Sequence, residues 1–322
     1  MPRASRSRID PRHLANLLAV SDYGSFNRAA AARGLSQPAL SNSIAQLERR
    51  LGFPVLTRSR RGSEVNEYGK SLLQGARTLE ALLSQIAEQV RLKRVGVSGP
   101  LRIGATPSMT LKFMPDLMGR VLQGVEAVQI HITEGLDDQL IPALQLGELD
   151  LVLGAASNTS LPGDLIEEGL FDDSFGIGVG SKSNWARRRS VTLAELKDAA
   201  WVVPGPGSAY RRHLEALFLT AGVPWPQNSV VSNSLALVES IVTLTDRVTV
   251  VTRLQTSMNN FWRMRVVPLR GGGRRTLSIK WRRADQLSEL AIRVLGAAHE
   301  LASGYQDAER RLARRESHNS SV

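Results

Sequence analysis

Cysteine is absent from this chain of 322 residues. Without thiols the protein forms no disulfide, holds no thiolate-bound metal ion and has no cysteine nucleophile. Its five histidines include no pair at i and i+4 and show no other spacing typical of metal ligands. We therefore predict a protein that uses neither a metal ion nor another cofactor.

Long hydrophobic runs are also missing. No segment approaches the roughly 18 consecutive apolar residues of a membrane span. The first residues, MPRASRSR, are basic and precede no apolar stretch, so we expect no secretory signal, and no lipidation motif is present. These absences predict a cytoplasmic protein without a membrane partner.

Positive charge is concentrated in the first part of the chain. Residues 1–98 carry a net charge of +9, residues 99–269 carry −3 and residues 270–322 carry +5, which together give +11. A basic segment of this kind is typical of a surface that displaces counterions from a phosphate backbone. The charge distribution therefore favours nucleic acid as a partner of the N-terminal segment.

Residues 25–52 carry the pattern of two short helices joined by a tight turn. Ser25 can cap the first helix, and Gly34 suits the turn because glycine tolerates a positive φ. Ser36 can cap the second helix, with Pro38 in its first turn. Four apolar residues spaced three or four apart give the second helix one buried face: Leu40, Ile44, Leu47 and Leu51.

The opposite face of this second helix begins with short hydrogen-bonding side chains. Gln37, Ser41 and Asn42 point outward near its N-terminus. A helix, a glycine turn and a second helix with a polar tip form the helix-turn-helix pattern, in which the second helix enters the major groove of DNA. From this stretch alone, an ordinary helical hairpin in a protein core is the alternative.

A basic turn follows the helix pair. Residues 58–63, with Arg58, Arg60 and Arg61, lie between apolar residues 55–56 and 65, as in a β-wing. Arginines in such wings contact phosphates or the minor groove. A solvated surface loop is the alternative interpretation.

Residues 68–94 predict one long helix with a hydrophobic seam. Its spacings of 4, 3, 4, 3 and 4 residues fit an a/d repeat, which favours pairing with another helix. A helix packed only on its own domain is the alternative. A paired helix would form a dimer with two recognition helices. The seam consists of Leu72, Ala76, Leu79, Leu83, Ile86 and Val90.

From residue 100 onward, strand and helix patterns alternate. This alternation predicts open α/β sheets with ligands at the carboxyl ends of the strands. The length allows two small lobes, with the chain crossing near residues 156–168 and returning near 266–269.

Hydroxyl and amide side chains mark several junctions between a strand and a helix. Free backbone N–H groups and the helix dipole favour an anion at such positions, so we predict a small carboxylate or phosphate ligand. Simple helix capping by each residue is the alternative. The candidates are Thr106, Ser108, Ser208, Asn233 and Ser234.

The order of these parts resembles the LysR-type transcriptional regulators. The resemblance is carried by SFNRAAAARGLSQPALSNSIAQLERRLGFPVLTRSRRG, the seam-bearing helix, GPLRIGATPS and EG…LQLGELDLVLG, and it runs collinearly from residue 12 to about 303. It implies an α+β multi-domain protein: a winged helix-turn-helix, a dimerising linker helix and a two-lobed α/β effector domain like the periplasmic binding proteins. It implies that DNA faces Ser36, Gln37, Pro38, Ser41 and Asn42, that Arg60 and Arg61 lie in the wing, and that Thr106, Ser108, Ser208 and Asn233 line the effector cleft.

The expected domains follow from the same comparison. They are a DNA-binding domain with a basic arm (1–67), a linker helix and hinge (68–98), an effector domain (99–303) and a polar C-terminal tail (304–322). Within the effector domain, lobe I is expected at about 99–163 and 267–303, and lobe II at about 164–266. The expected partners are double-stranded promoter DNA, a small effector such as an organic acid, RNA polymerase and further copies of the chain in a dimer or tetramer.

The sequence departs from the family pattern in three places. Arg33 stands where an apolar leucine is usual, so its stem would pack the end of the first helix. Asn42 stands where many members carry arginine, which changes the expected base preference. Residues 244–247, LTDR, replace a glycine-rich turn and would give the cleft a charged rim.

Enzymatic motifs are absent. The serine of Gly205–Ala209 is one place late for a G-x-S-x-G nucleophile elbow, and residues 176–183 lack the order of a phosphate loop. Asp137 and Asp138 are interpreted as a helix cap. We therefore predict a non-enzyme; an α/β enzyme or a small-molecule-binding protein fused to a DNA-binding domain is the alternative. Compaction of DNA without sequence preference is a third, disfavoured by the large ligand-type domain.

Overall fold

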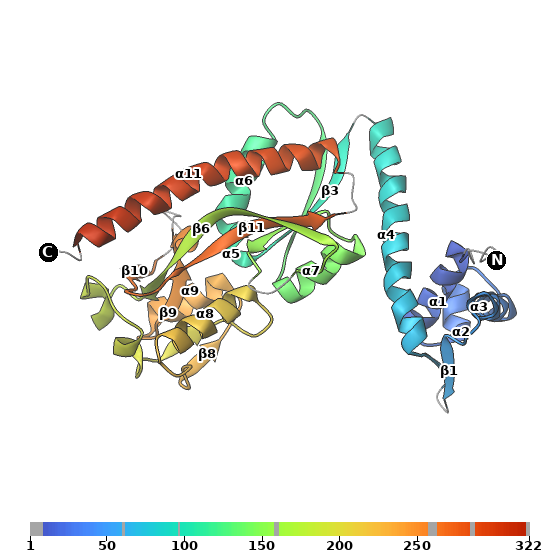
Figure 1. Ribbon diagram of the computed structural model, residues 1–322, viewed down its shortest axis with the longest axis horizontal. Helices are drawn as coiled ribbons and strands as arrows, with labels where there is room; N and C mark the ends of the chain where they lie inside the picture. Colours follow the sequence, from blue (N-terminus) through green and yellow to red (C-terminus); the bar gives the residue numbers. More distant parts are fainter. Residues whose placement is uncertain are drawn as a thin grey trace, which may run out of the picture. The chain divides into compact units, whose positions relative to one another are not determined.

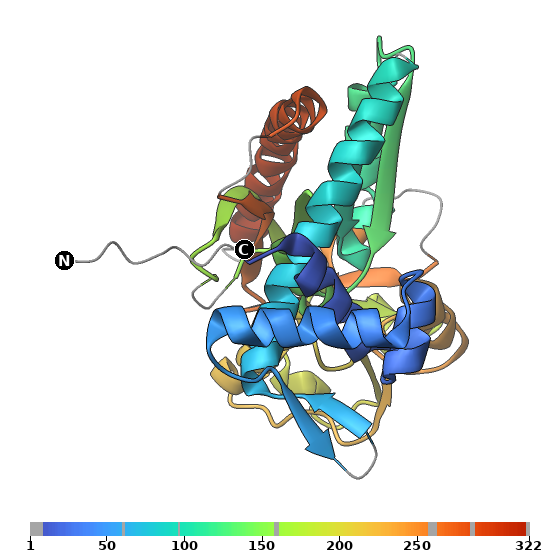
Figure 2. The same ribbon diagram turned by 90° about the vertical axis from the view of Figure 1, so that its right-hand side faces the viewer.

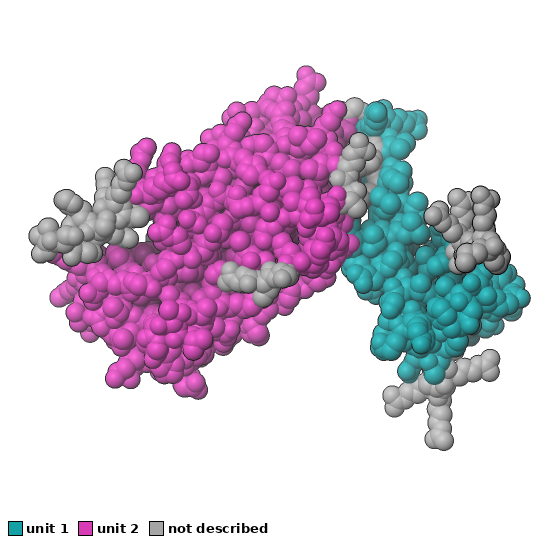
Figure 3. All heavy atoms as spheres, in the orientation of Figure 1, with its two compact units in different colours: residues 1–94, 146–148 teal, residues 95–145, 149–322 magenta. Residues whose placement is uncertain are grey.

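A computed structural model of the protein describes residues 9–59, 62–95, 97–157, 161–256, 263–283 and 287–319. The chain divides into two compact units (Figure 3): residues 1–94 with 146–148, and residues 95–145 with 149–322. We call them unit 1 and unit 2 and describe each by itself.

Unit 1 contains four helices and a two-stranded wing among its described residues (Figures 1 and 2). In the wing, β1 and β2 pair antiparallel, with Ser59 opposite Gly62. The elements are α1 (Pro11–Tyr23), α2 (Phe26–Ala32), α3 (Gln37–Leu51), β1 (Leu56–Ser59), β2 (Gly62–Val65) and α4 (Glu67–Arg94).

The small core of unit 1 fixes α3 against α1 and α2. Leu40 packs with Ala29 and Ala30 of α2, while Ile44 and Leu47 pack with the α1 side of the core. The turn between α2 and α3 contains Gly34 at φ +63°, in the left-handed region that favours glycine. The predicted helix-turn-helix is therefore present in the fold.

The linker helix α4 uses its predicted seam in two ways. Its first turns pack on the core of unit 1 through Leu72 and the neighbouring Leu73, and Ala76 is buried. The later seam residues Leu83 (54% exposed) and Ile86 (48% exposed) contact solvent. Leu72 therefore packs within unit 1 and is not exposed for pairing with another helix, because the start of α4 completes the core of unit 1.

Unit 2 has two lobes, each with its own hydrophobic core. In lobe I the strand order is β4-β3-β5-β11-β6, and β3 runs parallel to both β4 and β5. Helices α5, α6 and α11 pack on one apolar cluster of this sheet, and α7 packs on another. The elements are β3 (Ser98–Ala105), α5 (Pro107–Leu111), α6 (Phe113–Val121), β4 (Val128–Glu134), α7 (Asp137–Leu146), β5 (Leu151–Ala155), β6 (Leu165–Val179), β11 (Arg274–Arg282) and α11 (Glu289–Asn319).

Lobe II combines the last part of β6 with β9 and β10, and adds the parallel pair β7–β8. Helix α8 packs on the main core of the lobe, and α9 packs on a second cluster. The elements after β6 are the 3₁₀ turns η1 (Asn184–Arg187) and η2 (Ala194–Leu196), β7 (Trp201–Val203), α8 (Ala209–Thr220), β8 (Ser229–Val231), α9 (Leu235–Leu244), β9 (Thr249–Thr252), α10 (Arg253–Thr256) and β10 (Arg265–Pro268).

The long strand β6 joins the two lobes. Residues Leu165–Ser174 pair with β11 in lobe I, and Phe175–Gly178 pair with β9 in lobe II. The chain therefore crosses near residue 174, about ten residues later than the predicted boundary at 163/164. The return lies between β10 and β11, so residues 267 and 268 belong to the sheet of lobe II.

The helical segment that follows β3 is divided into α5 and α6. Lys112 between them has φ −133° and ψ −52°, outside the helical region. Pro115 follows in the first turn of α6, where a missing N–H is tolerated. In a continuous helix with α5 the same proline would remove a hydrogen bond and clash with the preceding turn. The break leaves α5 as a short helix at the end of β3.

The predicted polar tail from residue 304 is instead the second half of α11, which continues to Asn319. Tyr305 stacks on Phe171 of β6, with ring centroids 4.9 Å apart, and its hydroxyl donates to Asp116 of α6 at 2.6 Å. The side-chain carbonyl of Gln306 accepts from the backbone N–H of Asp172 at 2.8 Å. These contacts with lobe I hold a segment whose polar composition suggested a tail.

Candidate functional site

The N-terminal end of α3 presents the predicted DNA-reading residues. Ser36 caps the helix, because its Oγ accepts from the backbone N–H of Ala39 at 3.3 Å. Leu40, one turn along, is fully buried and fixes the rotation of the helix. The outward residues are all exposed: Gln37, Pro38, Ser41 and Asn42.

A polar cluster beneath α3 has no counterpart in the sequence analysis. The buried Ser43 Oγ lies 2.7 Å from His13 Nδ1 and accepts from Asn16 Nδ2 at 2.8 Å. Arg33 is exposed, and its Nε donates to Asn16 Oδ1 at 3.3 Å. The guanidinium of Arg33 therefore binds α1, whereas its stem was predicted to pack the end of α2. Through these hydrogen bonds α1 is linked to α3 and to the residue that follows α2.

The strands β1 and β2 of the wing flank the basic turn predicted from the sequence. Arg58 belongs to β1, opposite Ser63 of β2. Arg60 and Arg61 lie outside the described residues. Their predicted contact with DNA therefore stays a prediction.

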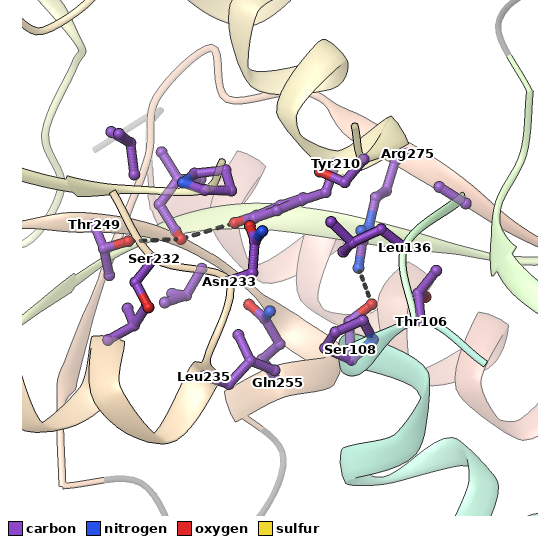
Figure 4. A pocket seen from close by; sticks show the side chains of 18 of the residues that line it. Thr106, Ser108, Leu136, Tyr210, Ser232, Asn233, Leu235, Thr249, Gln255 and Arg275 are labelled. Atoms are coloured by element: carbon purple, nitrogen blue, oxygen red, sulfur yellow. Dashed lines mark hydrogen bonds between the residues drawn. The ribbon is translucent and has the colours of Figure 1, made fainter. Parts of the chain in front are cut away.

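A cleft lies where the two lobes of unit 2 meet (Figure 4). It encloses about 680 Å³ of space not filled by atoms, part of it open solvent. Lobe I contributes Thr106, Ser108 and Arg275, and lobe II contributes Tyr210 and Asn233, so the lining comes from segments far apart in the sequence.

Arg275 of β11 is the buried cation of this cleft. Its Nη2 donates to Ser108 Oγ at 2.9 Å and to Asp173 Oδ2 at 2.9 Å, and its Nε donates to the same carboxylate oxygen at 3.1 Å. The second oxygen of Asp173 accepts from the backbone N–H of Leu254 at 2.9 Å. The guanidinium lies over the ring of Tyr210, 5.0 Å from its centroid. This ion pair therefore joins lobe I strands to the beginning of α10.

Two hydroxyl groups of the cleft differ in how they are used. Tyr210 donates to the backbone carbonyl of Val250 at 2.8 Å, and burial raises the pKa of its phenol. The ring therefore stays neutral at physiological pH and keeps this hydrogen bond. Thr106 Oγ1, in contrast, is buried and hydrogen-bonds to no atom of the described residues. A hydroxyl in this state is available to a ligand.

The candidates of lobe II are mostly engaged in local structure. Ser208 lines the cleft, and its Oγ caps α8 by accepting from Arg211 N–H at 3.0 Å. Asn233 also lines it, and its Oδ1 accepts from Gly205 N–H at 2.8 Å. Ser234 is not among the lining residues described; its Oγ accepts from Leu237 N–H at 3.4 Å as a helix cap.

The charged rim expected at residues 244–247 is not part of this cleft as described. The guanidinium of Arg247 instead donates to the backbone carbonyl of Trp201 at 3.1 Å and to Asn228 Oδ1 at 3.2 Å. These bonds hold the β7–β8 end of lobe II. The departure from the family pattern at this point therefore serves the lobe rather than the cleft.

The predicted site did not include Arg275, Asp173 or Tyr210, and Asp137 was predicted only as a helix cap. Asp137 Oδ2 accepts from the backbone N–H of Ala209, in the other lobe, at 2.8 Å. The sequence gives no local signal for the ion pair, because Asp173 and Arg275 each stand next to a second residue of the same charge, Asp172 and Arg274.

Neither a metal centre nor a membrane span is found in the described part of the chain. No three His, Cys, Asp or Glu side chains there are grouped to hold a metal ion. None of the helices described is both long enough and apolar enough to cross a bilayer.

Comparison with known proteins places both parts of the chain. Residues 11–70 match the family model "Bacterial regulatory helix-turn-helix protein, lysR family", and residues 94–303 match "LysR substrate binding domain". The regulator GbpR of Azospirillum brasilense is 28% identical over 77% of this chain and 73% of its own length. The transcriptional dual regulator OxyR of Escherichia coli is 29% identical over 66% of this chain and 68% of its own length.

Solved structures share the fold. CbnR, a LysR family regulator, in complex with its target DNA superposes with a TM-score of 0.66 at 18% identity, covering 91% of this chain and all of CbnR. Full-length OxyR from Pseudomonas aeruginosa gives 0.62 at 22% identity, covering 92% and 95%. The relatives named here are transcriptional regulators rather than enzymes, in accord with the absence of enzymatic motifs. The chain belongs to the LysR family of bacterial transcriptional regulators.

Proposed function

We propose that this regulator binds a specific promoter sequence as a homo-oligomer and responds to a small organic acid held in the cleft of unit 2. The observation that carries the proposal is the arrangement of Thr106, Ser108 and Arg275 at one end of the cleft. Two hydroxyls and a guanidinium there offer the donors that a carboxylate needs. Because DNA is its partner, we place the protein in the cytoplasm.

The two lobes supply a route from ligand to DNA. Lobes joined by β6 and by the return to β11 can change their relative position when a ligand contacts both. A ligand that prefers one arrangement shifts the population of regulators toward it, and a coupling of about 1–3 kcal/mol changes DNA affinity several-fold to a hundredfold. The effector acts on the promoter through this coupling.

A thermal-shift screen tests the ligand. We expect small carboxylates to raise the unfolding temperature of the full-length protein, whereas neutral sugars and amines do not, because a ligand that binds the folded state stabilises it by about 2.7 kcal/mol at 100 times its Kd. Ser108→Ala should weaken the response, and Ser240→Ala, on the exposed side of α9, should leave it unchanged. Stabilisation by sugars or amines alone would refute the acid, and an unaltered response in Ser108→Ala would refute the site.

Gln37 is expected to read a base edge. Gln37→Ala should weaken binding to the selected operator by about 1–3 kcal/mol, because a good side-chain contact with a base discriminates by that amount. Fluorescence anisotropy with the operator and with a scrambled duplex measures the effect. Binding to the scrambled duplex should hardly change; an equal loss on both would make Gln37 a backbone contact instead.

A further inference from the structure

Asp137 lies between the N-termini of two helices that belong to different lobes. It is the first residue of α7 in lobe I, and its Oδ2 accepts from the N–H of Ala209, the first residue of α8 in lobe II, at 2.8 Å. The residue is 8% exposed, and it lines the cleft.

The position suits a carboxylate for electrostatic reasons. The first N–H groups of a helix have no partner within the helix, and the helix dipole places partial positive charge there. Ser208 Oγ satisfies the N–H of Arg211 but not that of Ala209, which Asp137 satisfies instead. Without the carboxylate, two positive helix ends would face each other across the lobes.

The turn that precedes α8 leaves space for the carboxylates at the start of α7. Gly207 has φ +96°, and a Cβ atom at this position would overlap Asp138 Oδ2. Two successive carboxylates of lobe I therefore meet the turn that precedes α8 in lobe II. Glycine meets both demands of that turn, because it tolerates the positive φ and leaves room for Asp138.

The buried cation of the cleft already has a carboxylate partner other than Asp137. Arg275 is paired with Asp173, so Asp137 is not neutralised by that guanidinium. We propose that Asp137 is a built-in carboxylate ligand of the α8 N-terminus, which ties lobe II to lobe I and keeps anions from solution out of that position. The effector carboxylate therefore binds at the end of the cleft that contains Thr106 and Ser108. This last consequence rests on the proposed function; the tie between the lobes does not.

Chemical rescue tests the proposal. Asp137→Ala should lower the unfolding temperature of the full-length protein by roughly 3–10 °C, because a hydrogen bond to a charged group is lost. Sodium formate, which supplies the missing carboxylate, should recover at least half of that loss relative to sodium chloride at the same ionic strength. Asp137→Asn keeps an acceptor without charge, so it should unfold at an intermediate temperature and respond less to formate.

Asp198→Ala is the matched control, because it removes the same charge from an exposed residue of lobe II that is not among the residues lining the cleft. The formate-minus-chloride difference in Asp198→Ala and in the wild type should be smaller than in Asp137→Ala. Equal differences in the three proteins, or an unaltered unfolding temperature in Asp137→Ala, would overturn the proposal. Formate is itself a small carboxylate, so a stabilisation that all three proteins share reports on the proposed function. Only the additional stabilisation in Asp137→Ala reports on the tie between the lobes, so the two failures are distinguishable.

Discussion

Replacing Arg275 with methionine should lower the free energy of unfolding of unit 2 by about 3–5 kcal/mol. Methionine keeps much of the volume, but it leaves the Asp173 carboxylate, 1% exposed, without its cation. A buried charge without a partner is costly because the protein interior replaces its hydration poorly. Ser108 Oγ loses its donor in the same variant. This is the largest effect on stability that we expect.

The neighbouring residue provides a matched control. Arg274 also pairs with an aspartate, Asp172, but at 3.6 Å and with 59% of its side chain exposed. An exposed pair of this kind contributes about 0–1 kcal/mol, so Arg274→Met should have a small effect. The two variants differ by one position along β11 and remove the same charge.

Urea unfolding followed by tryptophan fluorescence measures the difference. All five tryptophans lie between residues 185 and 281, so the signal reports on unit 2 and not on the DNA-binding unit. The double variant Arg275→Met with Asp173→Asn should recover part of the stability, because neither partner then remains charged. Equal losses in Arg274→Met and Arg275→Met would show that the buried pair is not special.

The helix-turn-helix was predictable because its signals are local. The Ser36 cap, Pro38 in the first turn, the glycine turn and the apolar period predicted a second helix that begins after Ser36, and α3 spans Gln37–Leu51. Each signal acts within a few residues, where chain geometry determines which side chains meet.

The buried ion pair beside the cleft was not predictable from the same kind of pattern. Asp173 and Arg275 lie 102 positions apart, and each belongs to a pair of like charges of which the fold buries only one member. The same holds for Lys280 and Glu167, whose Nζ and Oε1 are 3.0 Å apart between β11 and β6. A buried charge is tolerated through its partner, and the sequence pattern does not identify a distant partner.

The apolar period of α4 also could not show which of its residues pack within unit 1 and which are exposed. The seam of α4 is continuous in the sequence, but Leu72 serves the core of unit 1 while Leu83 and Ile86 are exposed. The apolar period gives the face of a helix; the length over which another element covers that face depends on the tertiary fold.

The exposed part of that seam leads to the largest expected effect on DNA binding. The double variant Leu83→Glu with Ile86→Glu should abolish dimerisation and weaken binding to an operator with two half-sites by at least about 100-fold. Apolar side chains contribute about 1.5–3 kcal/mol each when fully buried, and paired charges of one sign would repel. A dimer gains about 10²–10⁴ in avidity from its second reading helix, which a monomer lacks.

Analytical ultracentrifugation and fluorescence anisotropy test this prediction together. Both residues are exposed in one copy of the chain, so the variant should retain its helical circular dichroism and its weak binding to a single half-site. Ser84→Glu is the control, because a residue one position beyond Leu83 is rotated by about 100° around the helix and lies off the seam. It should remain dimeric and bind the two-site operator normally. If the double variant stays dimeric, the contact between copies lies elsewhere; if it becomes monomeric without losing operator affinity, one recognition helix is sufficient.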